Sequence, residues 1–421
     1  MRTISEQADV LVVGGGTSGA IAAIQAARAG AQTTVVEQHS RLGGTGTLGG
    51  VSAVQYFFAG PRQVIRGIGW EMINRALEMD GRELPDFGDL RNRPGRNVVA
   101  NPHCHSIVLE QSALEAGATL RYHELAVEAS GTAGDWAVRC IGKGIERVIR
   151  CREIIDCTGD ADIVAMLELP RERSEVRQPG TLIYRLGGYE PDDIDAEQAQ
   201  RMYEQALSDG TLKTGDFWLT HRPFSRFLAS RGGNAMHVFG ADSTTSESQT
   251  AADLAGRASV ARMLSFVRSL PGGENATIEH MCESTAVRET YRIVGEQKVT
   301  YDDYMSGRVF EDAVGYTFYF IDIHTESGAE GQFLPEGVVP TLPLGAMVPK
   351  GSAGILAAGR SISSDRKAHS ALRVEASCMA MGQACGAAAA LGTNRGIVSR
   401  DVPISDVRAL LSEHNAILPE L

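Results

Sequence analysis

The chain has 421 residues, of which 43% are hydrophobic and 22% are charged, an ordinary balance for a globular protein. This length exceeds what one compact core usually holds, so we expect two lobes. A formal net charge of −12 argues against a nucleic-acid partner, and no apolar run approaches the roughly 18 residues of a membrane span.

The first expected element is a buried parallel strand at residues 9–13, which leads into a glycine-rich turn. Residues 14–19 match the pattern G-x-G-x-x-G and open an apolar helix. A second strand at residues 33–37 ends at Glu37, where an acid can accept hydrogen bonds from an adenosine ribose. This order predicts a nucleotide site with the pyrophosphate on the amides of the turn. Glu37 disfavours a 2′-phosphate and leaves FAD or NAD.

Three later segments bear on the choice between FAD and NAD. A second glycine-rich turn, at residues 41–47, directly follows the ribose acid, where a plain NAD dehydrogenase continues with a helix and a strand. Residues 153–162 are expected to form a strand that runs into a Thr-Gly-Asp turn. Residues 354–360 are expected to form a short strand ending in Gly-Arg, and a helix rich in Ala and Gly follows from about residue 372 to 391.

Together these stretches, which span residues 12–390, resemble the bacterial FAD-dependent oxidoreductase family of the glutathione-reductase-like superfamily, which includes invasion-protein-A-type flavoproteins. The resemblance implies one FAD, which we expect to be bound non-covalently, and leaves the substrate open. The expected cofactor-binding residues are Gly14, Gly16, Thr17, Ser18, Gly19, Glu37, Gln38, Arg41, Gly43, Gly44, Thr45, Thr158, Gly159, Asp160, Gly359, Arg360, Leu372 and Arg373.

The expected fold class is α/β, with a Rossmann-like FAD-binding lobe and an inserted α+β substrate lobe. We expect the FAD-binding lobe at 1–165, the substrate lobe at 166–339 and the return to the FAD-binding lobe at 340–421. Within the substrate lobe, strands are expected at 182–189, 237–242, 290–300 and 316–324, and helices at 197–210 and 249–273. No second G-x-G-x-x-G occurs, so a separate NAD(P)H domain is not expected.

Two histidines are candidate catalytic residues. His324 ends a predicted strand with Asp322 on the same face, a pattern that indicates an oriented general base or, equally well, a buried structural pair. His369 precedes the Ala/Gly-rich helix and is expected to face the flavin, the alternative being a surface loop histidine.

Arginines supply two further candidates. Arg288 and Arg292 come together in either a strand or a helix, which suits a substrate carboxylate; the alternative is an Arg–Glu network between lobes. The resemblance covers Arg288, which favours it for function. Arg373 is expected in the first turn of the Ala/Gly-rich helix, beside the pyrimidine side of the flavin, where it would stabilise reduced flavin. The alternative is a surface ion pair with Glu375 or Asp365.

The remaining motifs are interpreted as packing. Residues 103–105 read His-Cys-His, but no second cluster completes a metal site. Cys378 and Cys385 are expected to be packing thiols, and the aromatic run at 318–320 to be core. The tryptophans, also expected in the core, are Trp70, Trp136 and Trp218. Seven cysteines without a C-x-x-C pair, and no room for a signal peptide before the first glycine motif, predict reduced thiols and a cytoplasmic location.

The predicted activity is hydride transfer to FAD from a small polar substrate, which the arginines allow to be anionic. The electron acceptor stays open between oxygen, a quinone and a partner protein, and a homo-oligomer is compatible with the sequence. Two alternatives belong to other classes: a flavin-dependent hydratase or isomerase with structural FAD, and an interaction protein that retains a flavin fold.

Overall fold

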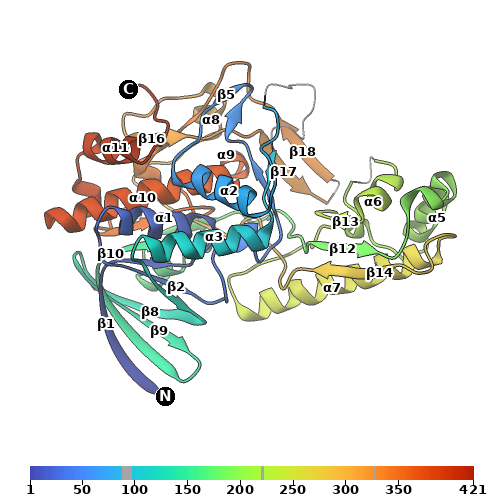
Figure 1. Cartoon of the computed structure of the whole chain (residues 1–421), viewed down its shortest axis with the longest axis horizontal. Coiled ribbons are helices and arrows are strands. Elements are labelled where there is room, and N and C mark those ends of the chain that lie inside the picture. Colours follow the sequence, from blue (N-terminus) through green and yellow to red (C-terminus); the bar gives the residue numbers. More distant parts are fainter. Residues whose placement is uncertain (88–96, 220–221, 327) are drawn as a thin grey trace.

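The computed structural model describes residues 1–87, 97–219, 222–326 and 328–421. Figure 1 shows a larger body that contains both ends of the chain and a smaller body at the other end of the long axis. Among the residues described, no helix is both long and apolar enough to cross a membrane.

The larger body is built on a seven-stranded sheet. Its strands are β1 (Arg2–Val13), β2 (Thr33–Glu37), β7 (Thr119–Tyr122), β8 (Glu124–Thr132), β9 (Asp135–Gly142), β10 (Ile145–Asp156) and β20 (Ile355–Ala357). The order is β7-β2-β1-β10-β9-β8, and β20 pairs in parallel with the end of β10. β7, β2, β1 and β10 are also parallel, whereas β8 and β9 form an antiparallel meander with the first half of β10. The strands predicted at 9–13, 33–37 and before the Thr-Gly-Asp turn are therefore confirmed.

Two helices with small side chains pack closely against each other beside this sheet (Figure 1). They are α1 (Thr17–Arg28) and α10 (Glu375–Arg395). A Cβ atom at Gly382 would lie 2.1 Å from the Ser18 carbonyl oxygen, and one at Gly386 would lie 2.4 Å from the Ala22 carbonyl oxygen. Because no side chain separates the two backbones, the glycines of α10 determine how near the helices approach. The predicted Ala/Gly-rich helix is confirmed, although it begins at Glu375 and is preceded by the separate short helix α9 (Arg366–Leu372).

Other elements complete the larger body. Its remaining helices are α2 (Ile68–Met79), α3 (Pro102–Glu115), α4 (Asp162–Met166), α8 (Tyr301–Ser306) and α11 (Ile404–Glu413). Short antiparallel strand pairs are β3 (Ala53–Gln55) with β6 (Asn97–Val99), β4 (Phe58–Ala59) with β5 (Arg62–Gln63), β11 (Arg171–Arg173) with β15 (Tyr291–Ile293), β16 (Ala313–Tyr316) with β19 (Thr341–Pro343), and β17 (Ile321–Thr325) with β18 (Gly328–Gln332).

In its described residues, the smaller body has a sheet of three short strands and three α-helices. The strands, in the order β13-β12-β14, are β12 (Tyr184–Gly187), β13 (Gly232–Gly233) and β14 (Thr277–Met281), and the helices are α5 (Ala196–Ser208), α6 (Ser225–Ser230) and α7 (Ser246–Ser269). The strand predicted within 182–189 and both predicted helices are confirmed, and α7 ends just before Pro271 as expected.

The other predicted strands of this region need correction. Residues 237–242 do not form a strand: Val238 makes one isolated bridge to Gly180, and the chain then turns at Gly240, which has φ +73°. The segment 290–300 contributes only the three residues of β15, and 316–324 is divided between β16 and β17. Turn-forming glycines and loop contacts interrupt runs that the residue pattern alone presents as continuous.

Two large hydrophobic cores accompany the two bodies. One core draws on residues 182–287 and belongs to the smaller body. The other combines α1, α10 and the central strands with residues such as Val299, Tyr304 and Leu342. The segment around residues 299–348 thus packs with the larger body, and it carries β17 to the junction with α9.

Candidate functional site

The first glycine turn joins β1 to α1 and leaves room above the helix N-terminus. Gly14 has φ +93°, and a Cβ atom there would lie 2.4 Å from the Cys157 carbonyl oxygen. At Gly19 a Cβ atom would lie 1.9 Å from the Gly14 carbonyl oxygen, whereas one at Gly16 would meet nothing within 4 Å. No side chain caps α1, and its first turn contains no acidic residue. The free amides and the open space suit a phosphate group.

The second glycine turn lies directly on the first. Gly43 donates its N–H to the Gly15 carbonyl oxygen at 2.8 Å, and the Thr17 hydroxyl donates to the Gly43 carbonyl oxygen at 3.2 Å. A Cβ atom at Gly44 would be 2.9 Å from Gly16 Cα. Two backbone segments that the sequence only suggested to be related therefore form one cradle.

Glu37 ends β2 beside this cradle and is buried. Its Oε2 accepts the Gly15 N–H at 2.7 Å and its Oε1 accepts the His39 N–H at 2.8 Å. Each carboxylate oxygen has a second lone pair, so the group can still accept from ribose hydroxyls. Of the neighbouring predicted residues, Gln38 is exposed and Arg41 lies 3.8 Å from the Glu283 carboxylate.

The Thr-Gly-Asp turn and the Gly-Arg turn meet on the far side of the cradle. Arg360 donates through Nε to the Gly159 carbonyl oxygen at 2.9 Å and through Nη2 to Asp160 Oδ1 at 2.7 Å. The Thr158 hydroxyl donates to Asp156 Oδ1 at 2.7 Å. Gly359 lies close to Ser18 at the start of α1, since a Cβ atom there would be 2.7 Å from the Ser18 hydroxyl. The side chains of Thr158, Asp160 and Arg360 thus brace the junction of the segments.

A chain of three polar side chains lies where β17 meets the smaller body. His324 Nε2 is 3.2 Å from Asp322 Oδ2, and His324 Nδ1 is 2.8 Å from His237 Nε2. The Trp218 indole stacks on His237 with ring centroids 5.0 Å apart and an interplanar angle of 3°. Arg373, between α9 and α10, donates through Nη2 to the Asp322 carbonyl oxygen at 3.3 Å and lies 3.5 Å from Asp322 Oδ2.

Arg288, which follows the core segment of the smaller body, lies near these polar side chains and acts on the charges of Asp322 and His324. It is buried, and it donates to the Pro179 carbonyl oxygen at 2.5 Å and to Asn234 Oδ1 at 3.3 Å. Burial, together with the nearby Arg373 guanidinium, lowers the pKa of Arg288 to about 9. Among the residues described, Arg288 has no carboxylate within 4.0 Å.

The charges in this cluster do not cancel. Burial and the Arg288 guanidinium lower the pKa of His324 to about 4 and that of His237 to about 2, so both imidazoles are neutral at pH 7. Burial alone would raise the pKa of Asp322, but the hydrogen bond from His324 and the two guanidinium groups outweigh this effect. The pKa is therefore below its usual value, and Asp322 is ionised at pH 7. Two guanidinium groups therefore face one carboxylate in a buried place.

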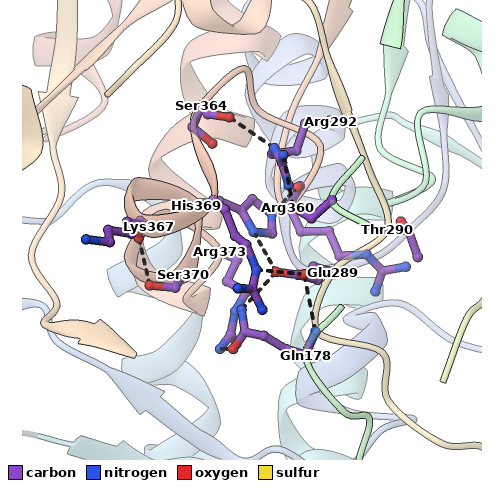
Figure 2. A network of polar contacts seen from close by, with 12 residues as sticks. Gln178, Glu289, Thr290, Arg292, Arg360, Ser364, Lys367, His369, Ser370 and Arg373 are labelled. Atoms are coloured by element: carbon purple, nitrogen blue, oxygen red, sulfur yellow. Dashed lines mark hydrogen bonds and ion pairs between the residues drawn. The ribbon is translucent and has the colours of Figure 1, made fainter. Parts of the chain in front are cut away.

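A second buried network lies beside this cluster (Figure 2). Glu289 accepts from the Gln178 side chain at 3.0 Å, and it lies 3.5 Å from Arg366 Nε and 3.9 Å from His369 Nδ1. His369 donates through Nε2 to the Arg360 carbonyl oxygen at 2.7 Å, because a carbonyl can only accept. Burial and the nearby Arg292 hold the pKa of His369 well below its usual value. Gln178 links the two groups, since its Oε1 accepts from Arg373 at 3.3 Å.

Comparison with known proteins fits this arrangement. A model of the FAD dependent oxidoreductase family matches residues 9–411. The chain belongs to this family. No curated protein matches the sequence. FAD is accordingly the cofactor of this oxidoreductase, and the open space at Gly16, the uncapped helix and the Glu37 carboxylate fit it.

Several solved structures of flavoenzymes resemble this family member at low identity. A geranylgeranyl bacteriochlorophyll reductase-like protein from Thermoplasma acidophilum is 12% identical, with a TM-score of 0.45 over 97% of this chain and 82% of its own. The p-nitrophenol 4-monooxygenase PnpA from Pseudomonas putida is 11% identical, with a TM-score of 0.42 over 98% of this chain and 85% of its own. The anhydrotetracycline hydroxylase OxyS from Streptomyces rimosus is 13% identical, with a TM-score of 0.40 over 97% of this chain and 66% of its own.

The oxidoreductase brings three of its four predicted catalytic residues into one cluster: His324, Arg373 and Arg288. His369 instead lies in the second network, on α9 and fully buried, so the surface-loop alternative is wrong. The alternative for Arg373, a surface ion pair with Glu375 or Asp365, is also wrong, because this side chain contacts Asp322 and Gln178.

Other expectations about side chains also need correction. Arg292 does not join Arg288. It donates to the Ser364 carbonyl oxygen at 3.0 Å (Figure 2), and to the Ser174 hydroxyl at 3.4 Å. Trp218 is half-buried in the polar cluster rather than in the core. Within the described residues, no group of three or more His, Cys, Asp and Glu side chains could hold a metal ion.

Sequence reasoning missed His237 and Gln178. His237 opens the segment that was expected to be a strand, and nothing in its local pattern relates it to His324, 87 residues later. Gln178 precedes Pro179 in a polar stretch without periodicity, although it bonds to both networks. Only contacts between distant segments identify these two residues.

Proposed function

We propose that this oxidoreductase removes a hydride from a small anionic substrate held by Arg288 and Arg373. The supporting observation is that the buried guanidinium group of Arg288 and the half-buried one of Arg373 face a single carboxylate, Asp322. An unbalanced buried charge is unfavourable, and a substrate carboxylate would supply the missing negative charge with charge-assisted hydrogen bonds. FAD supplies the two-electron acceptor when bound.

We assign proton uptake to the chain formed by Asp322, His324 and His237. A carboxylate can only accept, so Asp322 keeps the proton of neutral His324 on Nε2 and leaves Nδ1 as the acceptor. His237 donates to that Nδ1 atom through its own Nε2. A proton taken up by His237 can therefore pass to His324, where the imidazolium would be stabilised by Asp322.

The arginines would also make this base respond to the substrate. Arg288 and Arg373 both lower the pKa of His324, because they disfavour a further positive charge nearby. An anion bound between them offsets that effect and raises the pKa of His324. The base is then strongest when the site is filled.

The test is anaerobic mixing of the purified protein with small carboxylates and with their amides or esters, followed by flavin absorbance. The proposal expects bleaching by at least one 2-hydroxy or 2-amino carboxylate and none by its neutral derivative. Bleaching by neutral compounds only, at a rate unchanged in Arg288→Gln, would overturn it. Re-oxidation of the bleached protein by oxygen, a quinone or a protein fraction then separates the possible electron acceptors.

The same screen separates the other two functions. Product formation without bleaching would indicate a hydratase or isomerase, and no turnover together with tight binding of a protein would indicate an interaction role. Three expectations remain predictions. They are the resemblance to glutathione-reductase-like and invasion-protein-A-type flavoproteins, the cytoplasmic location, and the cofactor contacts expected from the sequence. We further propose that the substrate lobe is centred on residues 182–287, since these form their own core.

A further inference from the structure

Glu375 is a buried carboxyl group without a partner. It is the first residue of α10, and 8% of it is exposed. Neither Oε1 nor Oε2 has a hydrogen-bond partner among the residues described. Buried polar groups are nearly always hydrogen-bonded, so such a group requires an explanation.

The carboxyl group lies against the second glycine turn. A Cβ atom at Gly46 would be 2.8 Å from Glu375 Oε1 and 3.4 Å from Oε2. Gly46 ends the short helical turn Gly44–Gly46, in which Gly44 lies against Gly16 of the phosphate-binding turn. The absence of a side chain at Gly46 therefore leaves a place for the carboxyl beside the cradle.

The helix α10 contacts the phosphate-binding turn at one residue and carries Glu375 at its N-terminus. Gly382 of α10 lies against the Ser18 carbonyl in the first turn of α1. Glu375 is seven residues earlier, which corresponds to about 10 Å along a helix axis. The backbone of Glu375 is thus displaced along α10 from the contact with the phosphate-binding turn, toward the N-terminus of α10.

Burial of the carboxyl favours its protonated form at neutral pH. Burial raises the pKa of Glu375 to about 8, although it lies at a helix N-terminus, which favours a negative charge. Burial is the cause of this shift, and Glu375 in turn contributes to the raised pKa of Cys378 on the same helix. Gly46, on the other side, carries no titratable group. A neutral carboxylic acid has one O–H donor that needs an acceptor.

We propose that Glu375 is a FAD-binding residue, whose protonated carboxyl donates a hydrogen bond to an acceptor atom on the flavin half of the cofactor. The ring carbonyls and unprotonated ring nitrogens of oxidised flavin are acceptors without a proton of their own. The hydrogen bond explains why the protein offers the carboxyl no partner, and it does not depend on which substrate is oxidised.

This role makes FAD binding depend on pH in one direction. FAD binds the protonated carboxyl, so binding raises the pKa of Glu375 above its value in the protein without FAD. Affinity is constant below about pH 8 and falls above it, with a limiting slope of about tenfold per pH unit.

The test measures FAD release from the diluted holoenzyme by flavin fluorescence between pH 6 and 10. Glu375→Gln keeps an N–H donor and is expected to remove the pH dependence while binding FAD at pH 7. Glu375→Ala removes the donor and is expected to raise Kd about tenfold at pH 7, without further change up to pH 10. Glu153→Gln is the matched control, because Glu153 is also buried with a raised pKa but bonds to Ser399, and it should behave as the unchanged protein does. The same pH dependence in Glu375→Gln, or an unchanged Kd in Glu375→Ala, would overturn the proposal.

A second measurement uses the unchanged protein, so it tests the proposal even if these variants do not fold. Infrared difference spectra of the unchanged protein with and without FAD should show the carbonyl band of a protonated carboxylic acid moving to lower frequency when FAD binds. Spectra with no change in any protonated carboxyl band would overturn the proposal.

Discussion

Arg373 and His324 approach the same oxygen of one carboxylate: Asp322 Oδ2 lies 3.5 Å from Arg373 Nη2 and 3.2 Å from His324 Nε2. This shared oxygen couples the group assigned to substrate binding to the group assigned to proton uptake. A change at Asp322 should therefore affect the two functions in opposite directions.

Asp322→Asn is expected to tighten anion binding while slowing turnover. The asparagine oxygen can still accept from His324, but the negative charge that offsets Arg288 and Arg373 is lost. A carboxylate substrate should then bind more tightly, whereas loss of the charge that stabilises the imidazolium should lower kcat by about a hundredfold. Steady-state kinetics with the carboxylate found in the anaerobic screen measures both. An unchanged kcat would remove the Asp322–His324 pair from proton uptake.

Arg288→Gln is expected to raise the Kd of that carboxylate about 10- to 100-fold, the effect of losing a hydrogen bond between charged groups. The matched control is Arg292→Gln, because Arg292 is buried to a similar degree and also bonds to a carbonyl and an uncharged side chain. This control should lower thermal stability and leave Kd unchanged. Titration of flavin absorbance gives Kd, and equal effects of the two substitutions would argue against an anion site at Arg288.

Alanine at two glycines of the first turn should separate cofactor binding from folding. Gly16 has φ −65° and open space around a Cβ atom, so Gly16→Ala should fold normally and yet weaken FAD binding, because its methyl group occupies the space of the phosphate. Gly19→Ala places a methyl group 1.9 Å from the Gly14 carbonyl oxygen and should cost about 3 kcal/mol of stability. Thermal melting without FAD and FAD titration test the pair. A Gly16→Ala protein with unchanged FAD affinity would place the pyrophosphate elsewhere.

Glu153→Gln should change how stability depends on pH. Burial raises the pKa of Glu153 from 4.5 to about 7, so the folded state holds a proton that the unfolded state has released between those values. The free energy of unfolding of the unchanged protein should therefore fall, relative to Glu153→Gln, as the pH rises from about 4.5 to 7, by at most about 3 kcal/mol. Denaturant unfolding at pH 4.5, 6 and 8 measures the difference. A difference that is constant with pH would mean that Glu153 does not titrate in this range.

The nucleotide half of the fold was predictable because local patterns determine it. The strand at 9–13, the glycines of 14–19, the helix after them and Glu37 follow one another in the chain, and each constrains the next. The small residues of α10 also indicated a close approach, although not that α1 was the neighbour.

The polar cluster was only partly predictable, because its members come from four separate segments. The Asp322–His324 pair is local and follows from the alternation of a strand. Its neighbours His237, Arg288 and Arg373 arrive through loops and a helix connection, whose course depends on tertiary packing. For the same reason Arg288 and Arg292, four residues apart, bond to different partners although their spacing suggested a pair.

The pairing of β20 with β10 has a consequence for synthesis of the protein. Ile154 pairs with Ile355, so an interior edge of the cofactor-bearing sheet waits for about two hundred further residues to leave the ribosome. Until then β10 presents an open, apolar strand edge, and α1 lacks the helix α10 that packs against it in the folded protein. Nascent chains of this oxidoreductase should therefore depend on chaperones late in translation, and FAD can assist folding only after nearly the whole chain has been made.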